Sequence, residues 1–227
     1  MKIINEGIQY PIFTKIKLFN DEFEKADFIN NFKRETQQYI LVKPFVIPLP
    51  LEIHEPDTPR VILSDTNTNS KVEIGTNKVM IYFREHNTET ESQVERIYKF
   101  LTSYQINRIG IINNFTIKGL NKNGSDYLRD QLIKEDNLPS PKELDINYNT
   151  ESISTIPDIH LNNLISIRTN LDSNDIKIQT DINTLKELQD TPSFNIKIED
   201  FRKVKEYVEK KNKSLQDNFI HKGKVTF

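Results

Sequence analysis

The sequence predicts an α+β fold in which an antiparallel β-sheet is covered on one side by helices. Short runs of alternating apolar and polar residues recur along the chain, and longer segments with apolar residues at helical spacing follow them. Because groups of strands are each closed by a helix, we also expect two related halves. The prediction is one compact unit over residues 1–227, with halves at 1–138 and 139–227.

The first half is expected to open with a strand and a helix. Apolar residues alternate with Lys15 and Lys17 over residues 12–19, which is the period of a half-buried strand. Asn20 follows as the expected helix N-cap. The apolar residues at helical spacing after it are Phe23, Ala26, Ile29 and Phe32.

Residues 60–83 predict a meander of three short strands, at 60–63, 71–74 and 78–83, separated by polar loops. A helix is expected over 89–104, because Val94, Ile97 and Leu101 share one face and acidic residues lie near its start. A strand over 106–117 and a short helix over 127–132 complete this half.

The second half repeats this style. Apolar residues alternate over 144–148, 165–171 and 176–182, and the last two runs predict a hairpin. The polar side of its second strand carries Asp175, Lys177, Gln179 and Asp181. Residues 199–219 predict a long amphipathic helix.

Composition excludes several classes of function. The formal net charge of -2 and the pI near 6.1 provide no field toward nucleic acid or anionic lipid. The chain has no cysteine, no signal-peptide pattern and no apolar run long enough for a membrane span, so we expect a cytoplasmic protein without a membrane partner. Its six glycines form no phosphate-binding loop, and we expect no cofactor.

Several segments together resemble a known family. They are the meander at 60–83, the helix at 89–104, the strand Asn107-Arg108-Ile109-Gly110-Ile111-Ile112-Asn113-Asn114-Phe115, and a C-terminal helix that leads to Phe219 and Val225-Thr226-Phe227. Over roughly residues 44–227 this pattern is similar to a sporadically distributed, uncharacterised bacterial family. The chain departs from that pattern at Ile112 and Asn113, where an aromatic and an apolar residue are expected.

The order of elements is also similar to that of SecB-like export chaperones, an analogy of fold only. The uncharacterised family has no established activity, so the resemblance implies no catalytic residues. We therefore expect a non-enzymatic interaction or chaperone-like protein that holds a protein partner, or a second copy of itself, through an apolar groove or a sheet edge.

An alternative hypothesis is a Mg²⁺-dependent nuclease. Pro157-Asp158, followed by Asp175 and Lys177, resembles the PD-(D/E)xK nuclease pattern. Two carboxylates on adjacent strands can chelate Mg²⁺, and a lysine on the same face can activate the attacking water. The competing interpretation is a solvated β-face on which Lys177 pairs with neighbouring acids.

A second alternative is a nucleic-acid-binding regulator that acts through the C-terminal helix. Its basic residues are Arg202, Lys203, Lys205, Lys210, Lys211 and Lys213. Acidic residues are interspersed with them, so binding of phosphate groups requires the acidic side chains to point away from the nucleic acid. The competing interpretation is an ordinary solvent-exposed helix face, which needs no such arrangement.

Overall fold

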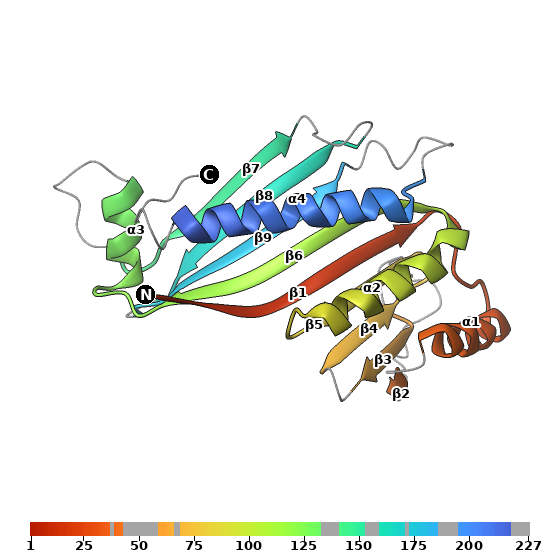
Figure 1. Cartoon of the computed structure of the whole chain (residues 1–227). Helices are drawn as coiled ribbons and strands as arrows, with labels where there is room; N and C mark the ends of the chain where they lie inside the picture. Colours follow the sequence, from red (N-terminus) through yellow and green to blue (C-terminus); the bar gives the residue numbers. More distant parts are fainter. Residues whose placement is uncertain are drawn as a thin grey trace, which may run out of the picture. The chain divides into compact units, whose positions relative to one another are not determined.

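The computed structural model describes residues 1–36, 39–42, 59–65, 69–132, 141–152, 159–170, 173–185 and 195–218. In these residues, nine strands form one sheet in the order β2-β3-β4-β5-β1-β6-β9-β8-β7 (Figure 1). The predicted antiparallel α+β class is confirmed. None of the described helices has the length and apolar run needed to cross a bilayer.

A similar order of elements occurs twice along the described chain, with one strand fewer in the second series, which starts at β6 and not at the predicted residue 139. A strand of 13 residues comes first in each case and is followed by a helix, then a meander, then a second helix. The first series is β1 (Lys2–Thr14), α1 (Glu22–Thr36), β2 (Ile40–Val42), β3 (Val61–Asp65), β4 (Ser70–Ile74), β5 (Lys78–Phe83) and α2 (Thr88–Leu101), closed by the short helix η1 (Thr102–Tyr104). The second is β6 (Ile106–Lys118), α3 (Gly124–Leu132), β7 (Asp145–Ser152), β8 (Leu161–Thr169), β9 (Ile176–Thr184) and α4 (Ile198–Asp217).

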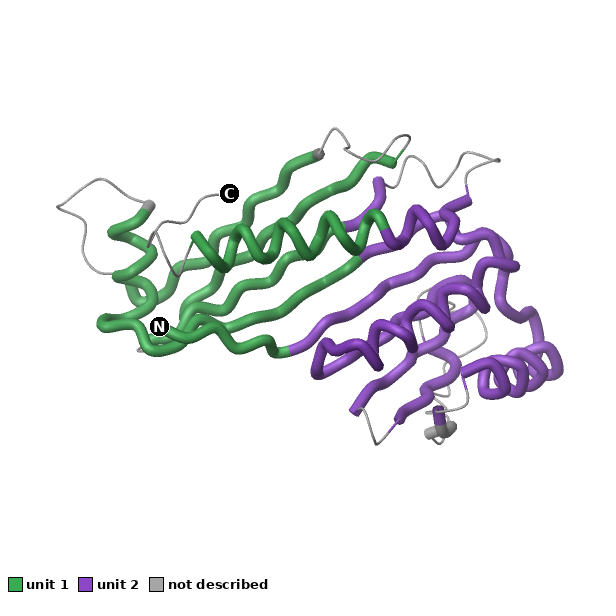
Figure 2. Tube along the Cα trace, viewed as in Figure 1, with its two compact units in different colours: residues 1–6, 111–182, 203–227 green, residues 7–110, 183–202 purple. Residues whose placement is uncertain are grey.

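The chain divides into two compact units, and each draws on separate segments (Figure 2). Unit 1 comprises residues 1–6, 111–182 and 203–227, and unit 2 comprises residues 7–110 and 183–202. The sequence analysis predicted halves that are each continuous in the chain, at 1–138 and 139–227, whereas both observed units are assembled from separate segments. The long strands β1, β6 and β9 and the helix α4 contribute residues to both units.

The core of unit 2 is rich in aromatic side chains. The rings of Tyr98 and Phe201 stack with centroids 4.4 Å apart, and Tyr10 lies 6.2 Å from Phe201. The Tyr98 hydroxyl donates to the carbonyl oxygen of Ile196 at 2.9 Å, so this buried phenol keeps a hydrogen-bond partner. Burial raises the pKa of Tyr98 well above its usual value. These contacts attach the start of α4 to α2.

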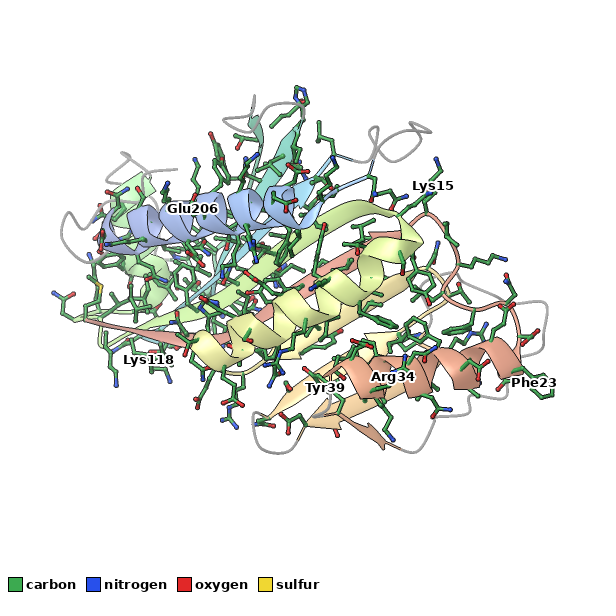
Figure 3. All side chains as sticks on the ribbon, turned by 45° about the vertical axis from the view of Figure 1, so that its right-hand side comes forward. Lys15, Phe23, Arg34, Tyr39, Lys118 and Glu206 are labelled. Atoms are coloured by element: carbon green, nitrogen blue, oxygen red, sulfur yellow. The ribbon has the colours of Figure 1, made fainter. Side chains whose placement is uncertain are left out.

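Helix α1 begins one residue later than predicted, and its buried face agrees with the predicted one only in part. Asp21, not Asn20, is the cap: its Oδ1 accepts the N–H groups of Phe23 and Glu24, both at 2.9 Å. The ring of Phe23 is 86% exposed and projects away from the ribbon (Figure 3), whereas Phe28 is buried. Of the predicted residues, Phe32 is buried and Ile29 is half-buried, whereas Phe23 and Ala26 are exposed. The buried stripe therefore runs through Phe28 and Phe32, which lie one turn apart.

Strand β1 runs from Lys2 to Thr14, not over residues 12–19 as predicted. Ile16, which was assigned to the apolar face, is 45% exposed. Pro11 sits inside this strand, opposite Met80 of β5, and β6 lies on its other side. Proline is uncommon in a central strand because it lacks the N–H of the ladder. Gly110 of β6 makes room for it: a Cβ at that position would come within 2.9 Å of Pro11 Cγ.

Tyr39 gives unit 2 a pH-dependent contribution to stability. Its buried hydroxyl donates to Oε1 of Gln93 at 3.0 Å and accepts from Oγ of Ser70 at 3.3 Å. Burial raises the pKa of Tyr39 to about 12, and the charge of Asp65 adds to the increase. In the unfolded chain a tyrosine ionises near pH 10. Between about pH 10 and 12 the unfolded state therefore loses this proton while the folded state keeps it, so the unfolding free energy falls as the pH rises.

We therefore expect Tyr39→Phe to cost about 1–3 kcal/mol at pH 8, because Gln93 and Ser70 lose their shared partner. The difference in unfolding free energy between the wild type and the variant should shrink between pH 10 and pH 12, since phenylalanine cannot ionise. Denaturant titrations of both proteins at pH 8, 10 and 11.5 measure this difference. An unchanged difference across that range would contradict the assigned role of Tyr39.

Unit 1 has a core that is mostly aliphatic. Its buried cluster joins the sheet to α3 through Leu128 and to α4 through Leu215. The remaining members come from β6, β8, β9 and the turn after β6: Phe115, Ile117, Leu120, Ile167, Ile176 and Ile178. The alternating residues predicted in β8 and β9 thus bury the expected side, because Ile167, Ile176 and Ile178 face this cluster.

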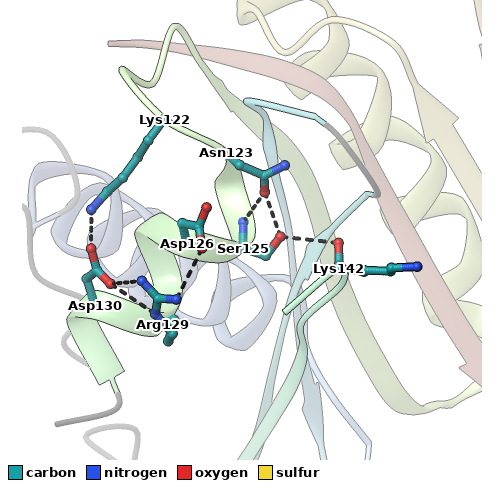
Figure 4. A network of polar contacts seen from close by, with 7 residues as sticks. All are labelled: Lys122, Asn123, Ser125, Asp126, Arg129, Asp130 and Lys142. Carbon is teal, nitrogen blue, oxygen red and sulfur yellow. Dashed lines mark hydrogen bonds and ion pairs between the residues drawn. The ribbon is translucent and has the colours of Figure 1, made fainter. Parts of the chain in front are cut away.

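A polar network fixes α3 to its surroundings (Figure 4). Asn123 Oδ1 accepts from the N–H of Ser125, at 2.9 Å, and from its hydroxyl. On the outer side, Asp130 binds Lys122 and Arg129. The hydrogen bond from Lys122, followed by that from Arg129, holds the pKa of the Asp130 carboxyl below its usual value.

Candidate functional site

An open strand edge belongs to unit 1. β7 is last in the sheet order, and β8 is its one partner among the described strands. Every side chain described in β7 is exposed or half-buried. The strand has eight residues and contains neither proline nor lysine, with which natural sheets commonly block an edge. β7 therefore offers a full strand length for pairing.

The backbone groups of β7 alternate between β8 and the open edge. The N–H of Thr169 donates to the carbonyl oxygen of Leu144 at 3.0 Å, and the N–H of Leu144 donates to Oγ1 of Thr169 at 2.9 Å, so the backbone groups of Leu144 face β8. In the same antiparallel register Asn149 lies opposite Leu164, five positions further along β7. Because hydrogen-bonded and open pairs alternate, the N–H and C=O of Asn147 and Asn149 face the open edge.

A cavity of about 370 Å³ lies beside this edge, between the sheet of unit 1 and the C-terminal half of α4. Its strand wall includes Tyr148 and Thr150 of β7 and Asn163 of β8, and its helix wall includes Lys211 and Leu215. We call it the β8–α4 cavity. Its volume falls in the range of about 300–1,000 Å³ that is typical of small-ligand pockets.

Asn163 contributes to the wall of this cavity, and its side-chain oxygen lies in the interior, where solvent does not reach it. The residue is 4% exposed, and its Nδ2 donates to the carbonyl oxygen of Thr150 at 3.4 Å. Its Oδ1 has no hydrogen-bond partner among the described residues. By contrast, Thr180 in the same wall donates to Asn212 at 2.8 Å. A buried oxygen without a donor costs about 1–3 kcal/mol.

One lysine supplies the only charge in the described lining of the β8–α4 cavity. Lys211 is the single charged residue among those described in its lining, and none of the described lining residues is acidic. The lysine is exposed on α4 and forms no ion pair within the described part of the chain. Ile165, Ile182 and Leu215 supply an apolar surface opposite the charge. The cavity thus combines apolar contacts with one cation.

The structure describes two of the three residues proposed for the nuclease. Asp158 lies outside the described residues. Asp175 precedes β9, where its Oδ2 is 3.8 Å from Nζ of Lys118 and its N–H donates to Oγ of Ser173. β8 starts at Leu161, at the opposite end of the β8–β9 hairpin from Asp175. The shared Mg²⁺ site of Asp158 and Asp175 stays a prediction.

Lys177 lines a second cavity, of about 330 Å³, on the face of the unit 1 sheet that carries its polar residues. Its neighbours in the lining include Glu6 and Arg168. Both are engaged: Glu6 accepts from the Thr116 hydroxyl at 2.6 Å, and Arg168 Nε lies 3.2 Å from Oδ2 of Asp145. This face is a solvated surface of mixed charge.

The basic residues of α4 differ in their partners. Arg202 binds both carboxylate oxygens of Glu95, at 3.2 and 2.7 Å, and this contact raises the pKa of the guanidinium. Lys205 lies 4.0 Å from Glu209. Glu206 projects outward from the same helix (Figure 3). Binding of nucleic acid by this helix stays a prediction.

Sequence reasoning found the strand of this site but not its cavity. The alternation at 144–148 predicted the strand now seen as β7. A signal for the cavity was present, because the apolar register of Ile165 and Ile167 continues backward to Asn163, a polar residue on the buried face. The position of Lys211 in the cavity lining could not be predicted, because it depends on where α4 packs against the sheet.

Comparisons with models of protein families, with curated proteins and with solved structures found no match. The similarity to an uncharacterised bacterial family and the SecB-like analogy stay predictions.

Proposed function

We propose that this chain is a non-enzymatic binding protein that accepts an extended segment of a partner protein as an additional strand along β7. The open edge of β7 carries this proposal. An added strand finds outward N–H and C=O groups at Asn147 and Asn149, which supply affinity independent of sequence. Side chains of the added strand can then select the partner.

The charges along β7 support the docking of a polypeptide. Asp145 at one end is engaged by Arg168, and Glu151 at the other lies 4.0 Å from His160. Between them, residues 146–150 carry no charge that would repel an incoming backbone. A chaperone-like role, in which the strand comes from an unfolded client, is one form of this activity.

Asn149→Pro tests this function. The Asn149 N–H faces the open edge, so its loss removes a docking donor without breaking a bond to β8, and the proline ring blocks an approaching strand. We expect peptides selected by the wild-type protein from a random library to bind the variant more weakly by about tenfold or more. The unfolding free energy should change by less than about 1 kcal/mol.

The matched control is Asn149→Ala, which removes the same side chain but keeps the N–H. It should retain the selected peptides. The proposal fails if the library yields no binder, or if the proline and alanine variants bind alike. Sedimentation of the purified protein tests whether the partner is a second copy of the chain. A dimer that dissociates in the Asn149→Pro variant would assign the edge to self-association.

A further inference from the structure

We infer that the segment which pairs with β7 is a basic strand of alternating character, with apolar side chains on one face and a lysine or arginine at each end of the other face. The inference rests on the proposed strand addition and names the class of partner. β7 pairs antiparallel with β8, and we expect the added strand to be antiparallel as well, because parallel pairing is slightly less stable.

One face of β7 carries all of its charges. Side chains alternate along a strand, so Asp145, Asn147, Asn149 and Glu151 share a face. Nδ2 of Asn147 donates to Oδ1 of Asp145 at 3.3 Å, which agrees with this arrangement. The N–H and C=O groups of the same four residues face the open edge. Residues of an added strand that lie directly opposite them therefore project to the same face, and the two outer ones each meet an acid.

The charge on this face of β7 is negative. The strand has two acids and no basic residue. Asp145 is already engaged by Arg168 of β8, at 3.2 Å. Glu151 is less compensated, since its Oε1 lies 4.0 Å from Nδ1 of His160 and its side chain is 59% exposed. Opposite charges across a strand pair stabilise it and like charges destabilise it, so a cation is favoured opposite each acid, and most of all opposite Glu151.

The other face of β7 determines the apolar positions. Ile146 packs against the core of unit 1, and Tyr148 and Thr150 line the β8–α4 cavity. Tyr148 keeps 38% of its surface exposed. Backbone groups of these three residues face β8, so an added strand forms open pairs with them, in which side chains lie closer together. Apolar side chains at these positions cover the exposed part of Tyr148.

The two faces together define a sequence pattern for the partner segment. It spans the positions opposite residues 145–151. Its first and last residues are basic, and its second, fourth and sixth residues are apolar. Polar residues lie between them, opposite Asn147 and Asn149. This is the alternation of a strand that is apolar on one face only.

A second copy of the chain does not have this pattern. In a symmetric antiparallel pair of two β7 strands that uses all the outward backbone groups, Asp145 lies opposite Glu151 of the second copy. This like-charge pair occurs at both ends of the interface. Sliding the strands by two residues separates the acids but loses hydrogen bonds at the ends. The edge therefore favours a different, basic segment over β7 itself.

Calorimetric titration of the full chain with two capped peptides tests the inference. The first is acetyl-Lys-Val-Thr-Val-Thr-Val-Lys-amide, and the second has glutamate in place of both lysines. We expect the lysine peptide to bind about tenfold more tightly, because the charge pairs at both ends change sign. Raising the salt from about 0.05 to 0.5 M should reduce this preference, since exposed charges are screened. Equal affinities at the lower salt would overturn the inference.

A third peptide, acetyl-Lys-Thr-Val-Thr-Val-Thr-Lys-amide, tests the assignment of the faces. It keeps both lysines but moves valine to the positions opposite Asn147 and Asn149. We expect it to bind about fivefold more weakly than the first peptide, because no apolar side chain then reaches Tyr148. An affinity equal to that of the first peptide would mean that charge alone directs binding, and would contradict the predicted pattern.

Glu151→Lys should change the preference between the lysine and glutamate peptides. We expect it to weaken the lysine peptide about fivefold and to strengthen the glutamate peptide, whereas a merely structural defect would weaken both. Glu206→Lys is the matched control, because it makes the same change of charge at an exposed residue of α4 (Figure 3). The control should keep the wild-type preference. An equal change in both variants would show a general effect of charge and remove the assignment to Glu151.

Sedimentation compares the basic partner with a second copy. We expect no self-association of the wild type through β7, and stronger self-association of Glu151→Lys, because Asp145 then meets a cation in the second copy. A wild-type dimer that dissociates in Asn149→Pro would overturn the inference.

Asn149→Pro distinguishes failure of the inference from failure of the proposed function. If the lysine and glutamate peptides bind the wild type alike and both bind the variant more weakly, strand addition stands and the charge pattern is rejected. If the lysine peptide binds the wild type and the variant alike, the edge backbone is not used and both proposals are rejected. If neither peptide binds the wild type, the charge pattern is rejected, and the random library decides on strand addition.

Discussion

Phe201→Ala is expected to lower the unfolding free energy by about 3–5 kcal/mol, the largest stability effect we predict. The Phe201 side chain has no exposed surface and stacks on Tyr98 at an interplanar angle of 19°. Its removal would leave a cavity against Tyr98 and Tyr10, and neither ring can fill it without breaking its own contacts. Equilibrium denaturation measures the loss.

Phe23→Ala is the matched control, because it deletes the same atoms from a side chain that is 86% exposed. Its effect should stay within about 0.5 kcal/mol. Similar losses in both variants would mean that Phe201 does not occupy the core of unit 2.

Gly124→Ala is expected to destabilise the protein by about 1–3 kcal/mol, although alanine favours a helix more than glycine does. The new Cβ would lie 2.7 Å from the carbonyl oxygen of Asp175 and 3.3 Å from that of Ser173. Both are backbone atoms, so neither can rotate away as a side chain would. The Gly124 N–H also donates to the Ser173 oxygen at 2.9 Å, and relief of the clash would lengthen that bond.

Gln131→Ala, at an exposed position of the same helix, should be neutral or slightly stabilising. Thermal denaturation of the two variants gives the comparison. A gain in stability for Gly124→Ala would show that helix propensity outweighs the contact with the turn before β9.

The spacing of apolar residues was sufficient to predict those helices and strands in which the apolar pattern is not interrupted. The helix predicted at 89–104 is confirmed as α2 followed by η1, and Val94, Ile97 and Leu101 are buried as predicted. β1 was missed over its first ten residues because Gly7 and Pro11 interrupt the pattern. Proline is accommodated in this strand by Gly110, about 100 residues away, and no local rule reports such a pairing.

The candidate site, too, could be predicted from the sequence only in part. The strand β7 could be predicted from alternation, but its place at the end of the sheet could not, since strand order depends on long-range pairing. Asn163 carried a signal in its register. Lys211 was predicted only as one basic residue of a helix, because charge patterns do not show which side faces a cavity.

The separate segments of unit 2 have a consequence for synthesis on the ribosome. Roughly 100 residues lie between Tyr98 and its stacking partner Phe201, which takes on the order of 5–20 s to translate. During that interval the nascent chain holds Tyr10 and Tyr98 without the ring that covers them. The core of unit 2 can therefore close only late, after most of the polypeptide has emerged.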